Sequence, residues 1–371
     1  MAYARDNIIR LDPYTPGEQP RQGELIKLNT NENPYPTLPA VLEAVATVTA
    51  EVLRRYPSPL ADDFRATAAT VHGLSPNMVI ATNGGDELLR LAVTVFCEPR
   101  STAPPGAPAG HGGLGVTDPT YSLYQALARI DDTNVTRVAL NEDWSLPADL
   151  AERMCQAGCR LVLLVSPHAP CGIGRDIDQL ASIAARLQGR AVLLIDEAYV
   201  DFADANALAL LDASSGLDNV LILRTLSKGY SLAGLRFGYG LGHRDLIAAL
   251  DKARDSYNTD AVSQVAAVAA LRHREDAAHT WQAVRDERTR MDQALRDRGH
   301  GVVPSQSNFL LTRPPAEGPA AADVYRSLKQ RGVLVRYFDQ DRLRDKLRIT
   351  IGTPPQNDAL LAALDRIYNQ R

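Results

Sequence analysis

The length, composition and charge of this 371-residue chain exclude several classes of protein. Its 40 basic and 44 acidic side chains give a net charge of −4, so the chain has no strong positive field to hold nucleic acid or an anionic membrane. Hydrophobic residues make up 45% and charged residues 23%, which is typical of a globular protein with a sizeable core and excludes a disordered or collagen-like chain.

The hydrophobic runs and the cysteines indicate the cellular location of the protein and whether it binds a metal. The longest runs, at 161–165 and 191–195, have the length of strands and fall far short of the ~18 residues that span a membrane. The N-terminus lacks the hydrophobic stretch of a secretory signal. The four cysteines are too few for a disulfide framework and form no zinc set with the histidines. We therefore expect a cytoplasmic protein without a metal site.

The middle of the chain alternates short hydrophobic runs with helical patterns. This pattern predicts an α/β fold whose mostly parallel sheet is covered by helices on both faces. Ligands of such sheets bind at the carboxyl ends of the strands, so the polar residues after each run are the candidates for a site. The expected strands are 78–82, 161–166, 191–195 and 220–223, and the expected helices are 86–96 and 178–187.

The pattern changes near residue 265, which predicts a second domain. A long helical stretch is expected at 262–298, a shorter helix at 321–331, and strands at 308–312, 333–337 and 347–351. We predict an N-terminal arm with part of the small domain in residues 1–50, a large domain in 51–265 and a small α+β domain in 266–371. The Pro- and Gly-rich residues 101–115 are expected to form a loop.

The segment 225–236, which reads TLSKGYSLAGLR, follows a predicted strand and contains a lysine among small and hydroxyl residues. Desolvation beside the end of a strand lowers the pKa of an amine and makes Lys228 a candidate nucleophile toward an aldehyde. The hydroxyl of Ser227 and the guanidinium of Arg236 suit a phosphate. The alternative for a lone Ser-Lys pair is a surface lysine on a solvated loop.

The tetrapeptide 196–199, DEAY, follows another predicted strand. Burying the Asp196 carboxylate is costly unless a cation pairs with it, and a protonated pyridine nitrogen would be such a cation. Tyr199 could donate to an oxygen on the same ring. A helix-capping or metal-binding aspartate is the alternative.

The segment 83–87, NGGDE, joins a predicted strand to a predicted helix. Glycines at such a junction allow backbone N–H groups and the helix dipole to face an anion. A plain tight turn is the alternative. The segment matches neither the dinucleotide nor the P-loop glycine motif, which disfavours nucleotide binding.

Taken together with further motifs, these segments resemble the fold-type I pyridoxal-phosphate enzymes of aminotransferase class I/II, and most closely the histidinol-phosphate aminotransferases. The resemblance covers nearly the whole chain, and its strength lies in the order of the motifs. The further motifs are LNTNENPY at 28–35, RYP at 55–57, DPTY at 118–121, SNF at 307–309 and LRIT at 347–350.

The resemblance implies a large domain built on a mostly parallel seven-stranded sheet flanked by helices, with a smaller α+β domain. It implies that Lys228 holds pyridoxal 5′-phosphate as a Schiff base and later moves the proton between substrate and cofactor. Asp196 would pair with the pyridinium nitrogen so that the ring acts as an electron sink, and Tyr199 would bond the ring hydroxyl oxygen.

The resemblance also implies the remaining binding residues and a partner. Tyr121 would stack on the ring; the phosphate would be held by Gly85, Asp86, Ser227 and Arg236. Tyr56 would reach that phosphate from a neighbouring subunit, which implies a homodimer with shared active sites. The substrate side would be formed by Asn31, Tyr35, Asn308, Arg336 and Arg348, of which the two arginines would bind the phosphate or carboxylate of the substrates.

The chain departs from the family pattern in two places. Where the family has an Asn that donates to the ring hydroxyl oxygen, this chain has Ala169 within SPHAPCG at 166–172. Losing one donor should cost about 0.5–1.5 kcal/mol unless His168 or a water replaces it. The loop at 101–115 is longer than usual. These departures bear on the substrate more than on the cofactor.

The resemblance implies ping-pong transamination of histidinol phosphate and 2-oxoglutarate, with pyridoxamine phosphate between the half-reactions. One alternative keeps the fold and the cofactor but changes the reaction: an aromatic aminotransferase, a phosphothreonine-type decarboxylase, or a cyclase or oxidase of specialised metabolism. Another is a catalytically silent binding protein, which the retention of Lys228, Asp196 and Arg236 disfavours.

Overall fold

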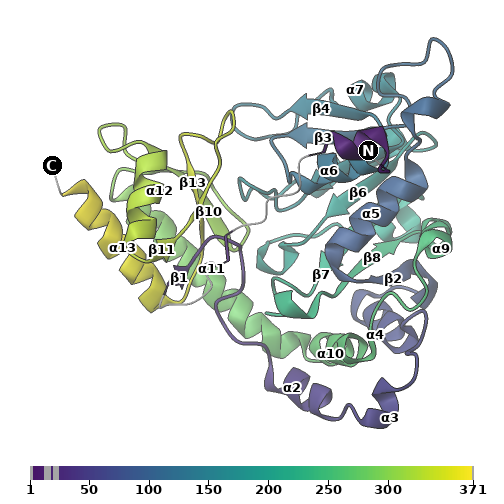
Figure 1. The fold of residues 1–371 in the computed structure, drawn as a ribbon, viewed down its shortest axis with the longest axis horizontal. Coiled ribbons are helices and arrows are strands. Elements are labelled where there is room, and N and C mark those ends of the chain that lie inside the picture. Colours follow the sequence, from purple (N-terminus) through teal and green to yellow (C-terminus); the bar gives the residue numbers. More distant parts are fainter. Residues whose placement is uncertain (1–2, 12–17, 20–24, 370–371) are drawn as a thin grey trace.

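The computed structural model describes residues 3–11, 18–19 and 25–369, and its centre is a seven-stranded sheet (Figure 1). The strand order is β2-β8-β7-β6-β5-β3-β4; β8 runs antiparallel to both of its neighbours, and the pairs among the others are parallel. This confirms the predicted fold class. The strands are β2 Val79–Thr82, β3 Leu114–Asp118, β4 Val135–Ala139, β5 Leu161–Val165, β6 Val192–Asp196, β7 Val220–Thr225 and β8 Gly238–Gly242.

Strands β3, β4 and β8 were missing from the sequence prediction, each for a local reason. The last two residues of the predicted 101–115 loop, Leu114 and Gly115, already belong to β3. The β4 strand is short, interrupted by Thr136 and Arg137, and partly exposed at the edge of the sheet. The β8 strand is rich in glycine because its neighbours approach closely: a Cβ on Gly240 would lie 2.9 Å from atoms of Ile80 and of Leu88.

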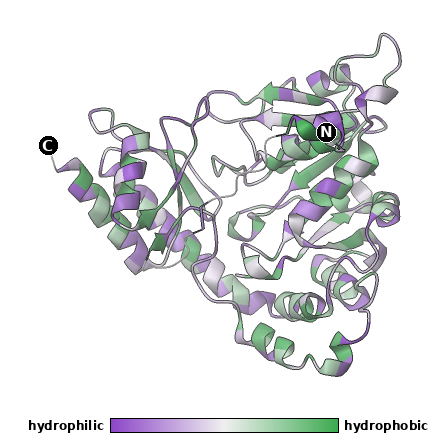
Figure 2. Ribbon diagram, in the orientation of Figure 1, coloured by the Kyte–Doolittle hydropathy of each residue, from purple (hydrophilic) through white to green (hydrophobic). Residues whose placement is uncertain are grey.

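Helices cover both faces of this sheet, and the strand side chains alternate between the two faces. In β6, for example, Val192 and Leu194 pack into one core while Leu193 and Ile195 pack into the other. In Figure 2 the strands of the central sheet are coloured mostly as hydrophobic, whereas the helices that flank it mix hydrophobic and hydrophilic residues. One face is covered by α5 Gly84–Phe96, α6 Leu123–Ile130 and α9 Arg244–Ala253; the other by α4 Asp62–His72, α7 Leu150–Ala157, α8 Ile177–Leu187 and α10 Ala261–Arg272.

The C-terminal part forms a second body beside the sheet. Its four-stranded antiparallel sheet has the order β12-β13-β10-β9, and a parallel pair joins β1 near the N-terminus to β11. The predicted boundary at residue 265 lies inside α10. The strands are β1 Ile26–Lys27, β9 Gly301–Val302, β10 Phe309–Arg313, β11 Val333–Leu334, β12 Arg336–Tyr337 and β13 Leu347–Thr350; the helices are α11 Arg274–Arg296, α12 Ala321–Gln330 and α13 Pro354–Tyr368.

Two predicted C-terminal elements are each divided in the structure. The helix expected at 262–298 is two helices, because the backbone at His273 leaves the helical region with φ −102° and ψ 32°. The strand expected at 333–337 divides at Val335, because β11 pairs with β1 while β12 pairs with β13.

The N-terminal segment connects the two bodies. Short helix α1, Asp6–Ile9, lies against the end of α6, where the Asn7 side chain donates to the Arg129 carbonyl oxygen at 2.9 Å. Helices α2 Pro39–Ala46 and α3 Ala50–Leu53 follow β1. No helix in the described residues is long and apolar enough to cross a membrane.

Candidate active site

A cavity of about 290 Å³ lies at the carboxyl ends of the parallel strands, where the sheet meets the C-terminal body. We call it the central cavity. Asp196 is the last residue of β6, and Lys228 follows the end of β7 by three residues. Eleven of the fourteen predicted site residues line the cavity: Asn31, Gly85, Asp86, Tyr121, Asp196, Tyr199, Ser227, Lys228, Arg236, Arg336 and Arg348.

Lys228 has the environment of a reactive amine. Its Nζ donates to the Thr30 carbonyl oxygen at 3.1 Å and lies 5.8 Å from the centre of the Tyr199 ring. Burial, helped by the nearby charge of Arg348, lowers the pKa of Lys228 to about 8. About a tenth of the amine is therefore unprotonated at pH 7, far more than for an ordinary lysine, and this is the nucleophilic form.

Asp196 is buried without a cationic partner among the hydrogen bonds and ion pairs of the described residues. One carboxylate oxygen accepts the Tyr124 hydroxyl at 2.6 Å, and the other accepts the Ala198 backbone N–H at 2.9 Å. Burial raises the pKa of Asp196 to about 6, although both hydrogen bonds act in the opposite direction. A bound cation beside Asp196 would therefore relieve the cost of burying this carboxylate.

Tyr124 is a site residue that the sequence reasoning missed. It lies on α6, fully buried, three residues after Tyr121, and both tyrosines line the central cavity. Their rings meet edge to face, with centroids 5.5 Å apart. A helix that included Tyr121 would have put positions 121 and 124 on one side; however, no helix was predicted there.

One end of the cavity has the form of an anion cradle. Helix α5 begins here, so its first backbone N–H groups point toward the cavity, which Gly85 and Asp86 line. Gly84 has a φ of +73°, and a Cβ at this position would lie 2.8 Å from Arg236 Nη2. The positive φ favours glycine at position 84, and the Arg236 guanidinium lies beside the start of the helix, where it could bind a phosphate together with the backbone N–H groups.

The opposite side of the cavity holds two arginines that face each other across a strand pair. Arg336 on β12 and Arg348 on β13 are register partners in the antiparallel ladder. The guanidinium carbons lie 5.1 and 5.3 Å from the centre of the Phe338 ring. Like charges directly opposite each other are unfavourable in a sheet. An anion in the cavity would compensate for that repulsion.

Three predicted site residues do not line the central cavity. Asn308 is fully buried and donates from Nδ2 to the Asn31 carbonyl oxygen at 3.0 Å, so it supports the wall from behind. Tyr35 packs against the core. Tyr56 is 82% exposed and stacks on Tyr257 with ring centroids 4.5 Å apart.

Position 169, in the loop after β5, has no side-chain donor. Ala169 lines the cavity and packs with Tyr199 and Phe309. His168 does not replace the missing amide: it is buried, lies outside the cavity lining, and its Nδ1 is 3.0 Å from Cys171 Sγ.

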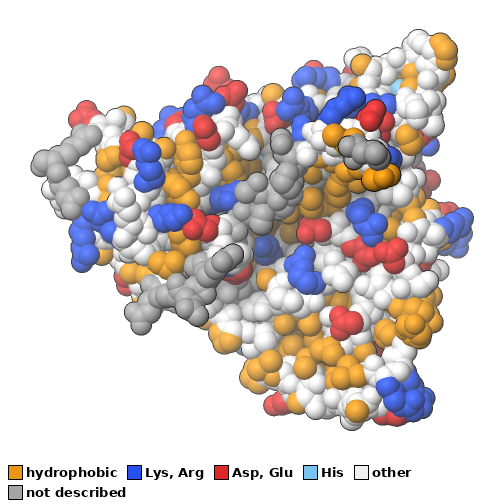
Figure 3. Space-filling model, in the orientation of Figure 1, with side chains coloured by type: hydrophobic (Ala, Val, Ile, Leu, Met, Phe, Trp, Pro, Cys, Tyr) orange, Lys and Arg blue, Asp and Glu red, His pale blue; other side chains and the backbone are white. Residues whose placement is uncertain are grey.

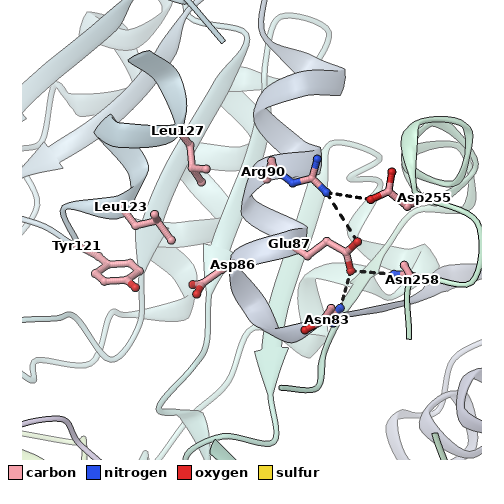
Figure 4. Close-up of a pocket in the computed structure, with 9 residues that line it drawn as sticks. All are labelled: Asn83, Asp86, Glu87, Arg90, Tyr121, Leu123, Leu127, Asp255 and Asn258. Atoms are coloured by element: carbon pink, nitrogen blue, oxygen red, sulfur yellow. Dashed lines mark hydrogen bonds and ion pairs between the residues drawn. The ribbon is translucent and has the colours of Figure 1, made fainter. Parts of the chain in front are cut away.

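A second hollow, of about 470 Å³, adjoins the central cavity and shares Asp86 and Tyr121 with it. Figure 4 shows the contacts of Glu87 in this hollow. Its carboxylate accepts from the Asn83 backbone N–H at 2.5 Å and from Asn258 Nδ2 at 2.8 Å, and it faces Arg90. Leu123 and Leu127 form its apolar wall.

Comparison with known proteins identifies the family. The model for aminotransferases of class I and II matches residues 23–364. The chain is 41% identical to the histidinol-phosphate aminotransferase of Microcystis aeruginosa, with 99% of each chain covered. It is 40% identical to that of Rhodopirellula baltica, with 98% of this chain and 95% of the relative covered.

A solved structure of the same family has a similar fold. The histidinol-phosphate aminotransferase of Sinorhizobium meliloti, crystallised in complex with pyridoxal 5′-phosphate, superposes with a TM-score of 0.81 at 25% identity, covering 92% of this chain and 90% of the other. This chain therefore belongs to the class I and II aminotransferases.

Proposed function

We propose that this enzyme transfers an amino group between histidinol phosphate and 2-oxoglutarate in histidine biosynthesis, using pyridoxal 5′-phosphate. The curated relatives of Microcystis and Rhodopirellula carry this name at about 40% identity over nearly the full chain. The observation that carries the proposal is the opposed pair Arg336 and Arg348, which faces the same cavity as Lys228.

The arginine pair suits both substrates of this reaction. Histidinol phosphate carries a phosphate and glutamate carries a distal carboxylate, and a guanidinium fork binds either anion with two parallel hydrogen bonds. One pocket would then serve the two half-reactions in turn, which gives ping-pong kinetics.

The cavity fits the cofactor on its own geometry. Gly85 and Asp86 at the start of α5, with Ser227 and Arg236, would hold the phosphate, and Tyr121 would stack on the ring. Asp196 would pair with the ring nitrogen, which would bring the pKa of this carboxyl back down. When bound, the cofactor supplies an electron sink for the electrons released at the substrate Cα.

The protein side chains supply the proton chemistry. Lys228 would hold the cofactor through Nζ, and as a free amine it would take the proton from the substrate Cα and return it during the transfer. Its pKa of about 8 suits both directions of this transfer near neutral pH. Tyr199 would hydrogen-bond the ring hydroxyl oxygen.

We infer a homodimer with shared sites as well. Large hydrophobic side chains are exposed on and after α2 and α3: Leu42, Val52, Leu53, Tyr56 and Leu60. Figure 3 shows hydrophobic side chains gathered over the part of the molecule that these helices form. A second copy would cover this surface, and its Tyr56 would reach the phosphate cradle through the second hollow. Free thiols at all four cysteines are consistent with the cytoplasmic location that we propose.

The proposal is tested by assaying the purified holoenzyme with histidinol phosphate, phenylalanine and arginine in parallel, each with 2-oxoglutarate. We expect glutamate to form fastest by far with histidinol phosphate. Equal or faster turnover of phenylalanine, or release of carbon dioxide in place of glutamate, would contradict the proposal.

A further inference from the structure

Asn31 occupies a constrained position in the wall of the central cavity. It is 1% exposed and has a φ of +56°, in the left-handed region. All of its polar groups are bonded. Its backbone N–H donates to Thr350 Oγ1 at 3.0 Å, its carbonyl oxygen accepts Asn308 Nδ2 at 3.0 Å, its Oδ1 accepts the Thr350 hydroxyl at 3.1 Å, and its Nδ2 donates to the Tyr199 hydroxyl oxygen at 2.9 Å.

These bonds fix the direction of the Thr350 hydroxyl proton and the orientation of the Asn31 side-chain amide. A backbone N–H can only donate, so the Thr350 oxygen accepts from it and uses its own proton toward the Asn31 side chain. The atom that Thr350 faces is therefore the amide oxygen, and the amide nitrogen faces Tyr199. Because the Tyr199 oxygen accepts this bond, its own proton points elsewhere, and Tyr199 lines the central cavity.

The loop after β5 provides no side-chain amide near the Tyr199 hydroxyl in this chain. Residue 169, where the family pattern has an asparagine, is an alanine in contact with Tyr199. His168 is directed at Cys171. The amide that reaches the Tyr199 hydroxyl comes instead from the N-terminal segment, which the Lys228 amine also contacts through Thr30.

We propose that Asn31 is a positioning residue, which directs the Tyr199 hydroxyl proton toward the ring hydroxyl oxygen of the cofactor in a chain whose residue 169 carries no donor. This inference rests on the cofactor assignment above. It gives Asn31 a role toward Tyr199 in place of the substrate contact that the resemblance implies. The charged or titratable groups near Tyr199 are Lys228, Arg348, Asp196 and Tyr124.

The test is Asn31→Asp, which keeps the size of the side chain and its tolerance of the left-handed region. Both carboxylate oxygens accept, so the Tyr199 proton turns toward residue 31 and leaves the cofactor oxygen without its donor. A donor at that oxygen stabilises negative charge there and favours loss of the neighbouring proton. We therefore expect the pH midpoint of the holoenzyme's visible absorbance to rise by about one unit, as in Tyr199→Phe, and the cofactor Kd to rise about tenfold.

A second substitution separates the lost donor from the added charge. Ala169→Asn places an amide at the cavity wall, so in the Asn31→Asp background it should bring the midpoint and the Kd most of the way back. A midpoint that Asn31→Asp leaves unchanged, or a shift that Ala169→Asn does not reverse, would overturn the proposal.

A neutral variant keeps the proposal testable if Asn31→Asp does not fold. Thr350→Val removes the hydroxyl that fixes the amide and should raise the midpoint by a smaller amount; an unchanged midpoint would contradict the inference. Failure of the cofactor assignment is distinguishable, because unsubstituted protein would then show no visible absorbance to titrate.

Discussion

The Asp196 carboxylate should destabilise the protein when the cofactor is absent. Its pKa rises from 3.8 to about 6 on folding because it is buried. At one pKa unit per 1.36 kcal/mol, ionised Asp196 costs the apoprotein about 3 kcal/mol. For an acid whose folded pKa is raised, this cost is absent below about pH 4, grows between pH 4 and 6 and is complete at pH 7. Asp196→Asn removes the charge, but its amide nitrogen meets one of the two donors that the carboxylate accepts, at a cost of about 1 kcal/mol. We therefore expect the free energy of unfolding of the apoprotein to rise by about 2 kcal/mol at pH 7.

Guanidinium unfolding of the two apoproteins at pH 4 and pH 7 measures this difference. The variant should be the more stable protein at pH 7, and its advantage should disappear at pH 4. The same variant should bind pyridoxal 5′-phosphate more weakly, because the partner of the ring nitrogen is gone. A variant less stable than the original at pH 7, or an advantage that does not depend on pH, would refute the reasoning.

Three further predictions concern the cavity and the loop behind it. Tyr124→Phe removes a hydrogen bond that lowers the pKa of Asp196, so cofactor Kd at pH 7 should rise about fivefold, whereas Tyr239→Phe, which removes a buried hydroxyl bonded to a histidine elsewhere, should leave it unchanged. Arg348→Gln should lower kcat/KM about 100-fold for histidinol phosphate and for glutamate alike; a loss confined to one substrate would disprove the shared anion site. Burial raises the pKa of the Cys171 thiol to about 11, so iodoacetamide at pH 8 should leave this residue unmodified in the native protein, as peptide mapping would show.

The sequence could predict the residues of the site better than the strands that carry them. Asp196 ends one buried hydrophobic run and Lys228 lies three residues beyond the end of another, and such runs form strands wherever helices cover both faces of a sheet. Strand β4 lies at the sheet edge and strand β8 is rich in glycine, so neither has the buried hydrophobic pattern on which strand prediction depends.

Contacts between distant segments could not be predicted from the sequence. Tyr124 meets Asp196 across 72 residues, and Asn31 meets Tyr199 across 168. Each pair depends on a register or helix position that only the folded chain defines. The resemblance placed Asn308 at the substrate, whereas its buried side chain bonds the backbone of Asn31.

The account rests on a covalent bond between the cofactor and Lys228, and one measurement tests it most directly. The holoenzyme is reduced with borohydride, digested and mapped by mass spectrometry, with Lys228→Ala treated in the same way. We predict a single phosphopyridoxyl adduct on Lys228 and none in the variant. An adduct on another residue, or one that persists in Lys228→Ala, would contradict the account.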